Sequence, residues 1–204
     1  MNLKEALEQL RKEEKRKFSQ TVDLIVNLKG LNLKKENINI FATIPFKTKD
    51  KKICAFLENK SKLLDTVTKL EFQKYKDKKS LKNLVKKYDF FIASAHLMPV
   101  VATIFGKVLG PAGKMPSPQL GIITQETDEI IKQSIEKISK SLKIRVKEAS
   151  IKSNIGNESM KDEEIIANIS ALYSAVINTL PKKKDNLKNV MLKFTMTKPI
   201  KLEM

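Results

Sequence analysis

The sequence predicts two domains, an α+β domain built from both ends of the chain and an α/β domain inserted between them. Apolar and polar residues alternate at both ends, which is typical of half-buried antiparallel strands. Between residues 50 and 148, short apolar runs lack that alternation and are separated by helix-like segments, which indicates a parallel sheet covered on both faces. We therefore assign residues 1–49 and 149–204 to the discontinuous domain and residues 50–148 to the inserted domain.

The N-terminal part begins with a predicted helix and continues with two strands. Apolar residues over 3–16 fall on one helical stripe, and the rest of this segment is rich in charge. Val22, Leu24 and Val26 alternate with polar neighbours, which predicts the first strand. The same alternation over residues 38–44 predicts a second strand, which a proline ends.

The middle of the chain predicts short strands alternating with helices. Buried strands are the ones that read as continuous apolar runs, because neither of their faces meets water. A last helix is expected to carry Ile131, Ile135, Ile138 and Leu142 on one stripe. The predicted elements before it are a strand at 53–57, a helix at 60–69, a strand at 71–75, a helix at 80–87 and a strand at 90–93.

The C-terminal part returns to the alternating pattern and contains one long helix. Ser159 followed by Asp162 is similar to a capping box, so we expect the helix to begin there. Its apolar stripe runs over residues 165–180, and Pro181 ends it. Alternation over residues 190–194 then predicts a strand.

The charge balance favours a polyanionic partner. The chain of 204 residues carries 40 Lys+Arg against 23 Asp+Glu, a net charge of +17. Each phosphate that a basic residue neutralises releases counterions, so affinity for nucleic acid rises steeply with their number. The alternative is a solvated Lys-rich surface, but solubility alone rarely needs more than about 8 net charges. We therefore expect a nucleic-acid partner.

Several classes of site are excluded or disfavoured by the residues present. Cys54 has no partner for a disulfide, and together with His96 it supplies too few ligands for a zinc site. A nucleophilic Cys54–His96 pair has no supporting pattern, so we expect no catalytic residue, no metal and no cofactor. No apolar run reaches the roughly 20 residues of a membrane span, and the charged N-terminus is unlike a signal peptide. We expect a cytoplasmic protein without membrane contact.

The densest cluster of glycine and proline covers residues 109–118, LGPAGKMPSP. A phosphate-binding P-loop requires G-x-x-x-x-G-K-[ST], with a hydroxyl residue that holds magnesium. Here Val108 takes the place of the first glycine, and Met115 takes the place of the hydroxyl residue. From the residues alone we predict a tight turn at the surface rather than a nucleotide site.

This cluster also carries a resemblance to a known family. GPAGKMPSP, preceded by DFFIASAHLMP, resembles the signature of the L1 family of large-subunit ribosomal proteins, and most of all its archaeal branch. Three further stretches resemble the same family: residues 17–21 (KFSQT), residues 155–158 (IGNE) and residues 194–196 (FTM). The resemblance extends from residue 17 to residue 199, almost the whole chain.

The resemblance implies both a fold and a function. The fold is a discontinuous RRM-like two-layer α+β domain with an inserted three-layer Rossmann-like α/β domain. The function is that of a structural, non-enzymatic component of the large ribosomal subunit, monomeric within the ribosome. It would bind large-subunit rRNA, form the mobile stalk near the exit site and assist release of deacylated tRNA. Many relatives also repress translation by binding their own mRNA.

The resemblance assigns RNA-binding roles residue by residue. Phe18 and Met196 would otherwise be expected in the core, and Thr21 and Thr195 could be ordinary strand formers. The sequence departs from the family pattern at Ala112, Thr197 and Lys198, where the family has Arg, Gly and Pro. The expected RNA-binding residues are Lys17, Phe18, Thr21, Asp23, Gly156, Asn157, Asn189, Thr195, Met196 and Thr197. The signature loop of the inserted domain consists of Gly110, Pro111, Gly113, Lys114, Met115 and Pro116.

Two other functions stay open at the level of sequence. One is a nucleotide-using enzyme with the inserted domain as its nucleotide domain, and the other is a non-specific basic RNA chaperone. For the rRNA-binding hypothesis we expect Thr195→Val to weaken RNA binding more than Lys114→Ala, since Lys114 is expected in a solvent-exposed loop. Thr197→Gly restores the family residue and is expected to be neutral or favourable for binding.

Overall fold

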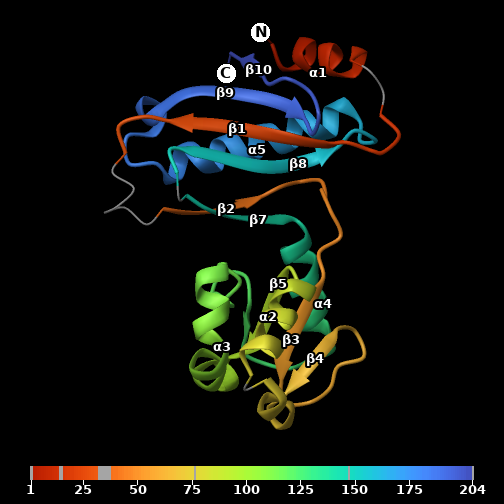
Figure 1. Ribbon diagram of the computed structural model, residues 1–204, viewed down its shortest axis with the longest axis vertical. Helices are drawn as coiled ribbons and strands as arrows, with labels where there is room; N and C mark the ends of the chain where they lie inside the picture. Colours follow the sequence, from red (N-terminus) through yellow and green to blue (C-terminus); the bar gives the residue numbers. More distant parts are fainter. Residues whose placement is uncertain (1, 14–15, 32–37, 76, 147, 204) are drawn as a thin grey trace. The chain divides into compact units, whose positions relative to one another are not determined.

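The computed structural model describes residues 2–13, 16–31, 38–75, 77–146 and 148–203. Parts of the predicted N-terminal helix (14–15) and of the following loop (32–37) lie outside the described residues. The chain divides into two compact units (Figure 1). The discontinuous unit comprises Met1–Lys49 and Lys140–Met204, and the inserted unit comprises Asp50–Ser139.

The discontinuous unit is built on a four-stranded antiparallel sheet with the strand order β10-β9-β1-β8. Two helices accompany it, and Figure 1 shows α5 running behind β1 and β8. A short 3₁₀ helix, η3 (Lys183–Asn186), precedes β9. The other elements are α1 (Leu3–Lys12), β1 (Thr21–Leu28), β8 (Ser150–Asn157), α5 (Asp162–Thr179), β9 (Leu187–Phe194) and β10 (Ile200–Leu202).

One face of this sheet is covered by both helices. Every second residue of β1 is buried, beginning with Val22, and these side chains share one core with Leu7 of α1 and Leu172 of α5. The intervening residues of β1 are only half-buried. This is the two-layer arrangement that the alternating sequence predicts.

A separate antiparallel ribbon places the second domain boundary earlier in the chain than predicted. β2 (Asn39–Thr43) pairs with β7 (Ser141–Arg145), and Ile40 and Ala42 are buried in the same core as α5. Residues 140–148 therefore belong to the discontinuous unit, so the boundary predicted between residues 148 and 149 is wrong. The sequence pattern hid this because Leu142 continues the apolar stripe of the preceding helix, although α4 (Asp128–Ser139) ends before it.

The inserted unit has three layers around a parallel sheet with the strand order β4-β3-β5-β6. All residues of β3 are buried. Cys54 and Phe56 face a core shared with α2 and α3, whereas Ala55 and Leu57 face a core shared with α4. The predicted fold class is confirmed. The elements are β3 (Ile53–Leu57), β4 (Asp65–Thr68), η1 (Lys69–Tyr75), α2 (Lys78–Lys87), β5 (Phe90–Ser94), η2 (Ala95–Leu97), α3 (Met98–Ala112) and β6 (Ile122–Ile123).

Two predicted elements of the inserted unit are exchanged in type. The helix expected at 60–69 contains strand β4, and the strand expected at 71–75 lies in the 3₁₀ helix η1. β4 exists because it pairs in parallel with β3, from Cys54 opposite Asp65 onward. That pairing outweighs the helical propensity of the local sequence.

The helix Asp162–Thr179 also begins later than predicted. Its first residue is Asp162 and its N-cap is Lys161, so Ser159 lies before the helix. The Lys161 backbone N–H donates to Glu164 Oε2 at 3.3 Å, which is one half of a capping box shifted by two residues. The acidic first turn suits the positive end of the helix dipole.

One described segment has the length and composition of a membrane span. Residues Ala95–Ala112 have a mean hydropathy of 1.3 over 18 residues. His96 and Lys107 interrupt its apolar run. Val101, Phe105 and Leu109 of this segment are buried in the core of the inserted unit, and 22% of the segment is buried.

Candidate nucleic-acid interface

The face of the antiparallel sheet away from the helices is polar at most positions. Along β1 this face is formed by Thr21, Asp23, Ile25 and Asn27, all half-buried. Strand register determines which residue of β9 lies opposite each of these positions. The pairs are Asp23 with Lys193, Ile25 with Met191 and Asn27 with Asn189.

Three chain segments meet at one end of this sheet. Thr21 is the first residue of β1 and lies opposite Asn157, the last residue of β8. On its other side, the Thr21 backbone N–H donates to Thr195 Oγ1 at 3.0 Å, and the two hydroxyl oxygens are 2.9 Å apart. The register therefore brings together residues of β1, of β8 and of the turn after β9 that are far apart in sequence, and Lys17 and Phe18 lie in the segment just before β1. We call Lys17, Phe18, Thr21, Asn157, Thr195 and Met196 the sheet-end cluster.

Two large apolar side chains of this cluster are exposed. Phe18 is 53% exposed and Met196 is 61% exposed, so the alternative that either belongs to the core is wrong. Exposed apolar side chains next to hydroxyl groups and a lysine match the surface on which unstacked nucleotides pack. The local arrangement can therefore offer RNA a packing surface, hydroxyl groups and positive charge together.

Thr197 is placed differently from the other residues of the 194–197 turn. It is 9% exposed, and its Oγ1 accepts the Phe194 backbone N–H at 2.9 Å. Its hydroxyl group therefore stabilises the turn and is not presented on the surface. The residue that replaces the family glycine has acquired a structural hydrogen bond, which the sequence alone did not indicate.

Gly156 and Asn157 form the end of β8. Gly156 is buried, and a Cβ atom there would lie 3.1 Å from Met160 Sδ, so the packing favours glycine. Asn157 Nδ2 donates to the Thr48 carbonyl at 3.3 Å.

Asp23 and Asn189 lie along the sheet face rather than in the sheet-end cluster. The Thr21 hydroxyl donates to Asp23 Oδ1 at 3.4 Å. Asn189 accepts a 2.6 Å hydrogen bond from Asn27 at the opposite end of β9, about 20 Å from Thr195 by strand geometry. Six of the predicted RNA-binding residues thus form the sheet-end cluster, Asp23 and Asn189 lie along the same face, and Gly156 and Thr197 are buried.

The signature loop closes α3 against α2 inside the inserted unit. Gly110 and Pro111 belong to the last turn of α3, and Gly113 caps it with a φ of 72°, a conformation that favours glycine. Lys114 Nζ donates to the carbonyls of Val85 and Tyr88, each at 2.8 Å, at the C-terminal end of α2. Met115 packs against the same core, and Pro116 is buried. Lys114 is half-buried, so the expectation that it is solvent-exposed is wrong.

Comparison with known proteins bears on both units. The sequence pattern of the ribosomal protein L1p/L10e family matches residues 10–198. The chain belongs to this family. It is 34% identical to large ribosomal subunit protein uL1 of Pyrobaculum calidifontis, over 98% of this chain and 92% of the relative. The corresponding proteins of Thermococcus kodakarensis and Nanoarchaeum equitans are each 35% identical, over 92% and 91% of this chain and 90% and 92% of theirs.

Membership of the L1 family settles the class of function. The protein is a structural component of the large ribosomal subunit in the cytoplasm, and it is not an enzyme. The hypothesis of a nucleotide-using enzyme is therefore wrong. The predicted resemblance to the archaeal branch is confirmed by these relatives.

The Cys54 thiol of this L1-family protein is buried. Burial, with a smaller contribution from Asp65, raises the pKa of the Cys54 thiol to about 12, so it stays protonated and unreactive near neutral pH. Within the described residues, no group of three or more His, Cys, Asp or Glu residues is placed to hold a metal ion.

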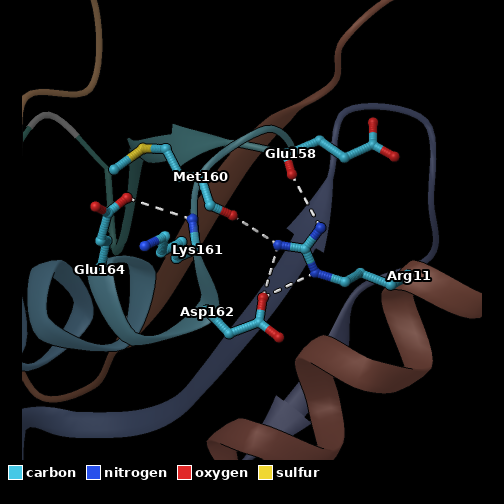
Figure 2. A network of polar contacts seen from close by, with 6 residues as sticks. All are labelled: Arg11, Glu158, Met160, Lys161, Asp162 and Glu164. Carbon is cyan, nitrogen blue, oxygen red and sulfur yellow. Dashed lines mark hydrogen bonds and ion pairs between the residues drawn. The ribbon is translucent and has the colours of Figure 1, made fainter.

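Two residues that the sequence did not single out contact segments of the sheet-end cluster or the turn beside it. Gln20 precedes β1 and is 2% exposed, and Arg11 of α1 contacts the turn between β8 and α5 (Figure 2). Gln20 continues the alternation of Val22 and Leu24 backward, which signals an inward position. For Arg11 the sequence offers only one signal, namely that it is one of very few arginines in a Lys-rich chain.

Proposed function

We propose that the protein binds folded large-subunit rRNA through the sheet-end cluster and the adjoining open face of the antiparallel sheet. The observation that carries the proposal is the pair of exposed apolar side chains, Phe18 and Met196, beside the paired hydroxyl groups of Thr21 and Thr195. Solvent-exposed apolar area of this kind is stabilised by a partner that covers it. The family of the chain makes rRNA the partner.

RNA recognition would depend on two kinds of contact. The net charge of +17 attracts RNA of any sequence, and exposed lysines such as Lys17, Lys152 and Lys201 can neutralise phosphates. Hydroxyl and backbone groups at the sheet end would read the shape of the RNA through its 2′-OH groups and sugar–phosphate backbone. The first kind gives salt dependence, and the second gives selectivity.

The finer roles follow from this anchoring. The discontinuous unit would hold the rRNA of the mobile stalk near the exit site, and the stalk would assist release of deacylated tRNA. A messenger that folds into the same shape as the rRNA site would compete for the sheet-end cluster, which would repress translation of the protein's own mRNA.

Binding to a stalk rRNA fragment, to tRNA and to an unrelated folded RNA, measured at several salt concentrations, tests the main proposal. We expect a preference for the stalk fragment that persists at every salt concentration. Lys17→Ala should reduce the salt slope by about 0.9 for all three RNAs, because one phosphate contact is lost. Equal affinity for all three RNAs would instead support a non-specific RNA chaperone.

A matched pair of substitutions at Phe18 tests the packing contact. Phe18→Leu keeps most of the apolar area but removes the ring, whereas Phe18→Ala removes both. If a base stacks on the ring, both variants should lose selectivity, with Phe18→Ala binding about tenfold more weakly than wild type or worse. Since Phe18 is exposed, neither change should lower thermal stability.

The messenger proposal is tested by competition. RNA from the leader of the protein's own messenger should displace the stalk fragment, with the same sensitivity to Phe18→Ala. A leader RNA that leaves the rRNA complex intact would exclude repression through this site.

A further inference from the structure

Gln20 connects all three segments of the sheet-end cluster. Its backbone N–H donates to Glu158 Oε2 at 3.2 Å, and its carbonyl accepts the Glu158 N–H at 2.8 Å. Its side-chain Oε1 accepts the Met196 N–H at 3.2 Å. Gln20, which is 2% exposed, therefore links the segment before β1 to the turn after β8 through its backbone and to the turn after β9 through its side chain.

Arg11 holds the turn after β8 from the side of α1. Figure 2 shows its guanidinium group surrounded by this turn. Nη1 donates to the Glu158 carbonyl at 3.0 Å, Nη2 to the Met160 carbonyl at 2.8 Å, and Nε to Asp162 Oδ1 at 2.8 Å. Only the planar fork of an arginine can serve three acceptors in this arrangement, because a lysine presents one compact ammonium group.

We propose that Arg11 and Gln20 are positioning residues that hold the sheet-end cluster in its RNA-binding geometry before RNA arrives. The inference rests on the proposed function of the cluster. Asn157, Thr195 and Met196 lie at the ends of strands or in turns, where the backbone would otherwise sample several conformations. Fixing them in advance reduces the entropy that RNA binding has to overcome.

The geometry favours positioning over direct contact with RNA. Gln20 is too buried to reach a ligand. The Arg11 donors point at the protein's own carbonyls and carboxylate, with a second contact between Nη2 and Asp162 Oδ1 at 2.6 Å. Neither residue should therefore contribute to the count of neutralised phosphates.

Three variants of the full chain separate positioning from stability and from charge. Gln20→Met keeps the length of the side chain but cannot accept the Met196 N–H. Arg11→Lys keeps the charge but loses the fork. Val176→Ala removes buried apolar volume from α5 without touching the network, and so serves as the stability control.

Amide hydrogen exchange, thermal unfolding and affinity for the stalk rRNA fragment are measured for each variant. Relative to Val176→Ala, we expect Gln20→Met to accelerate exchange at the Met196 amide and to weaken RNA binding about tenfold. Arg11→Lys should accelerate exchange at the Glu158 and Met160 amides and weaken binding, with the salt slope of wild type.

Several outcomes would overturn the inference. Wild-type affinity in Gln20→Met despite faster Met196 exchange would show that a fixed turn is not needed. A reduced salt slope in an Arg11→Met variant would show that Arg11 contacts phosphate directly. If Gln20→Met does not fold, Arg11→Lys carries the test alone. If wild-type protein shows no selective RNA binding, the proposed function fails, and the exchange data still report whether the network orders these turns.

Discussion

The two four-stranded sheets of this protein differ in how many of their faces are covered. In the inserted unit every residue of β3 is buried, because helices lie on both sides of the parallel sheet. In the discontinuous unit, β1 alternates between buried and half-buried residues, because the helices cover only one side. The difference indicates where a large ligand can bind. Of these two sheets, the antiparallel one presents strand side chains over a broad face.

The same contrast appears in how the two units use their polar loop residues. Lys114, in the most recognisable motif of the chain, donates to backbone carbonyls within its own unit. The 194–197 turn is far less conspicuous in sequence, yet it presents Met196 to solvent beside Thr195. A recognisable motif therefore identifies the family here, whereas the proposed interface lies elsewhere in the chain.

The largest expected effect comes from comparing two deletions of the inserted unit that differ in where the chain is rejoined. Joining residue 49 to residue 140 through a short flexible linker keeps β7, so we expect cooperative unfolding and retained RNA affinity. Joining residue 49 to residue 149 deletes β7 and leaves β2 without a partner, exposing Ile40 and Ala42. That variant should lose cooperative unfolding, as measured by circular dichroism during heating. Equal stability of the two variants would show that β7 is not part of the discontinuous unit, and the domain boundary would then lie after residue 148.

Cys54 tests how closed the inserted unit is. Its pKa of about 12 reduces the thiolate fraction near pH 8 about a thousandfold relative to an ordinary thiol, so a thiol reagent should react that much more slowly than with the unfolded chain. Because folding raises the pKa of the Cys54 thiol, the protonated thiol favours the folded state. This contribution to the free energy of unfolding is complete below about pH 9 and is lost as the pH rises toward 12. Reaction of native and denatured protein at the same rate would contradict a closed core.

Much of the fold follows from local sequence pattern, because burial on one or two faces leaves a direct trace in apolar periodicity. The strands around Val22 and Phe91 were predictable for that reason. β4 and β7 were not, since each depends on pairing with another strand, a nearby one for β4 (Cys54 with Asp65) and a distant one for β7 (Phe41 with Lys143). Local composition carries little information about such pairs.

The candidate site shows the same limit. The family resemblance identified Phe18 and Thr195 as candidates. The exposure of Phe18 and the contact of Thr195 with Thr21 are known only from the structure. Arg11 and Gln20 act through backbone atoms of other segments, so no residue-type pattern could pair them with their partners. The sequence likewise gave no sign that Thr197 hydrogen-bonds within its own turn.

A pair of substitutions compares the two units directly. Thr195→Val removes a hydroxyl group that would be covered by RNA, so affinity for the stalk fragment should fall by a factor corresponding to about 1–3 kcal/mol. Lys114→Ala should leave affinity almost unchanged and instead destabilise the inserted unit by about 1–2 kcal/mol, because two carbonyls at the end of α2 lose their donor. Filter binding at one salt concentration and thermal unfolding measure both effects. A larger affinity loss in Lys114→Ala would place the RNA site on the inserted unit.

The smallest expected effect concerns Thr197, where the structure changes the direction of a prediction. Family resemblance alone predicts that Thr197→Gly is neutral or favourable for RNA binding. In the structure the Thr197 hydroxyl accepts the Phe194 N–H, and Thr197 is not among the described residues with positive φ, so nothing in the backbone requires glycine.

We therefore expect Thr197→Gly to lower stability by about 1 kcal/mol and to weaken RNA binding slightly, through a looser 194–197 turn. Thr197→Ser keeps the hydroxyl group and should behave like wild type in both measurements. If Thr197→Gly binds RNA more tightly than both at unchanged stability, the backbone at residue 197 is itself in contact with RNA. The interface would then extend from Met196 into the turn. The hydrogen bond between Thr197 and Phe194 would stabilise the turn of this chain at the expense of RNA affinity.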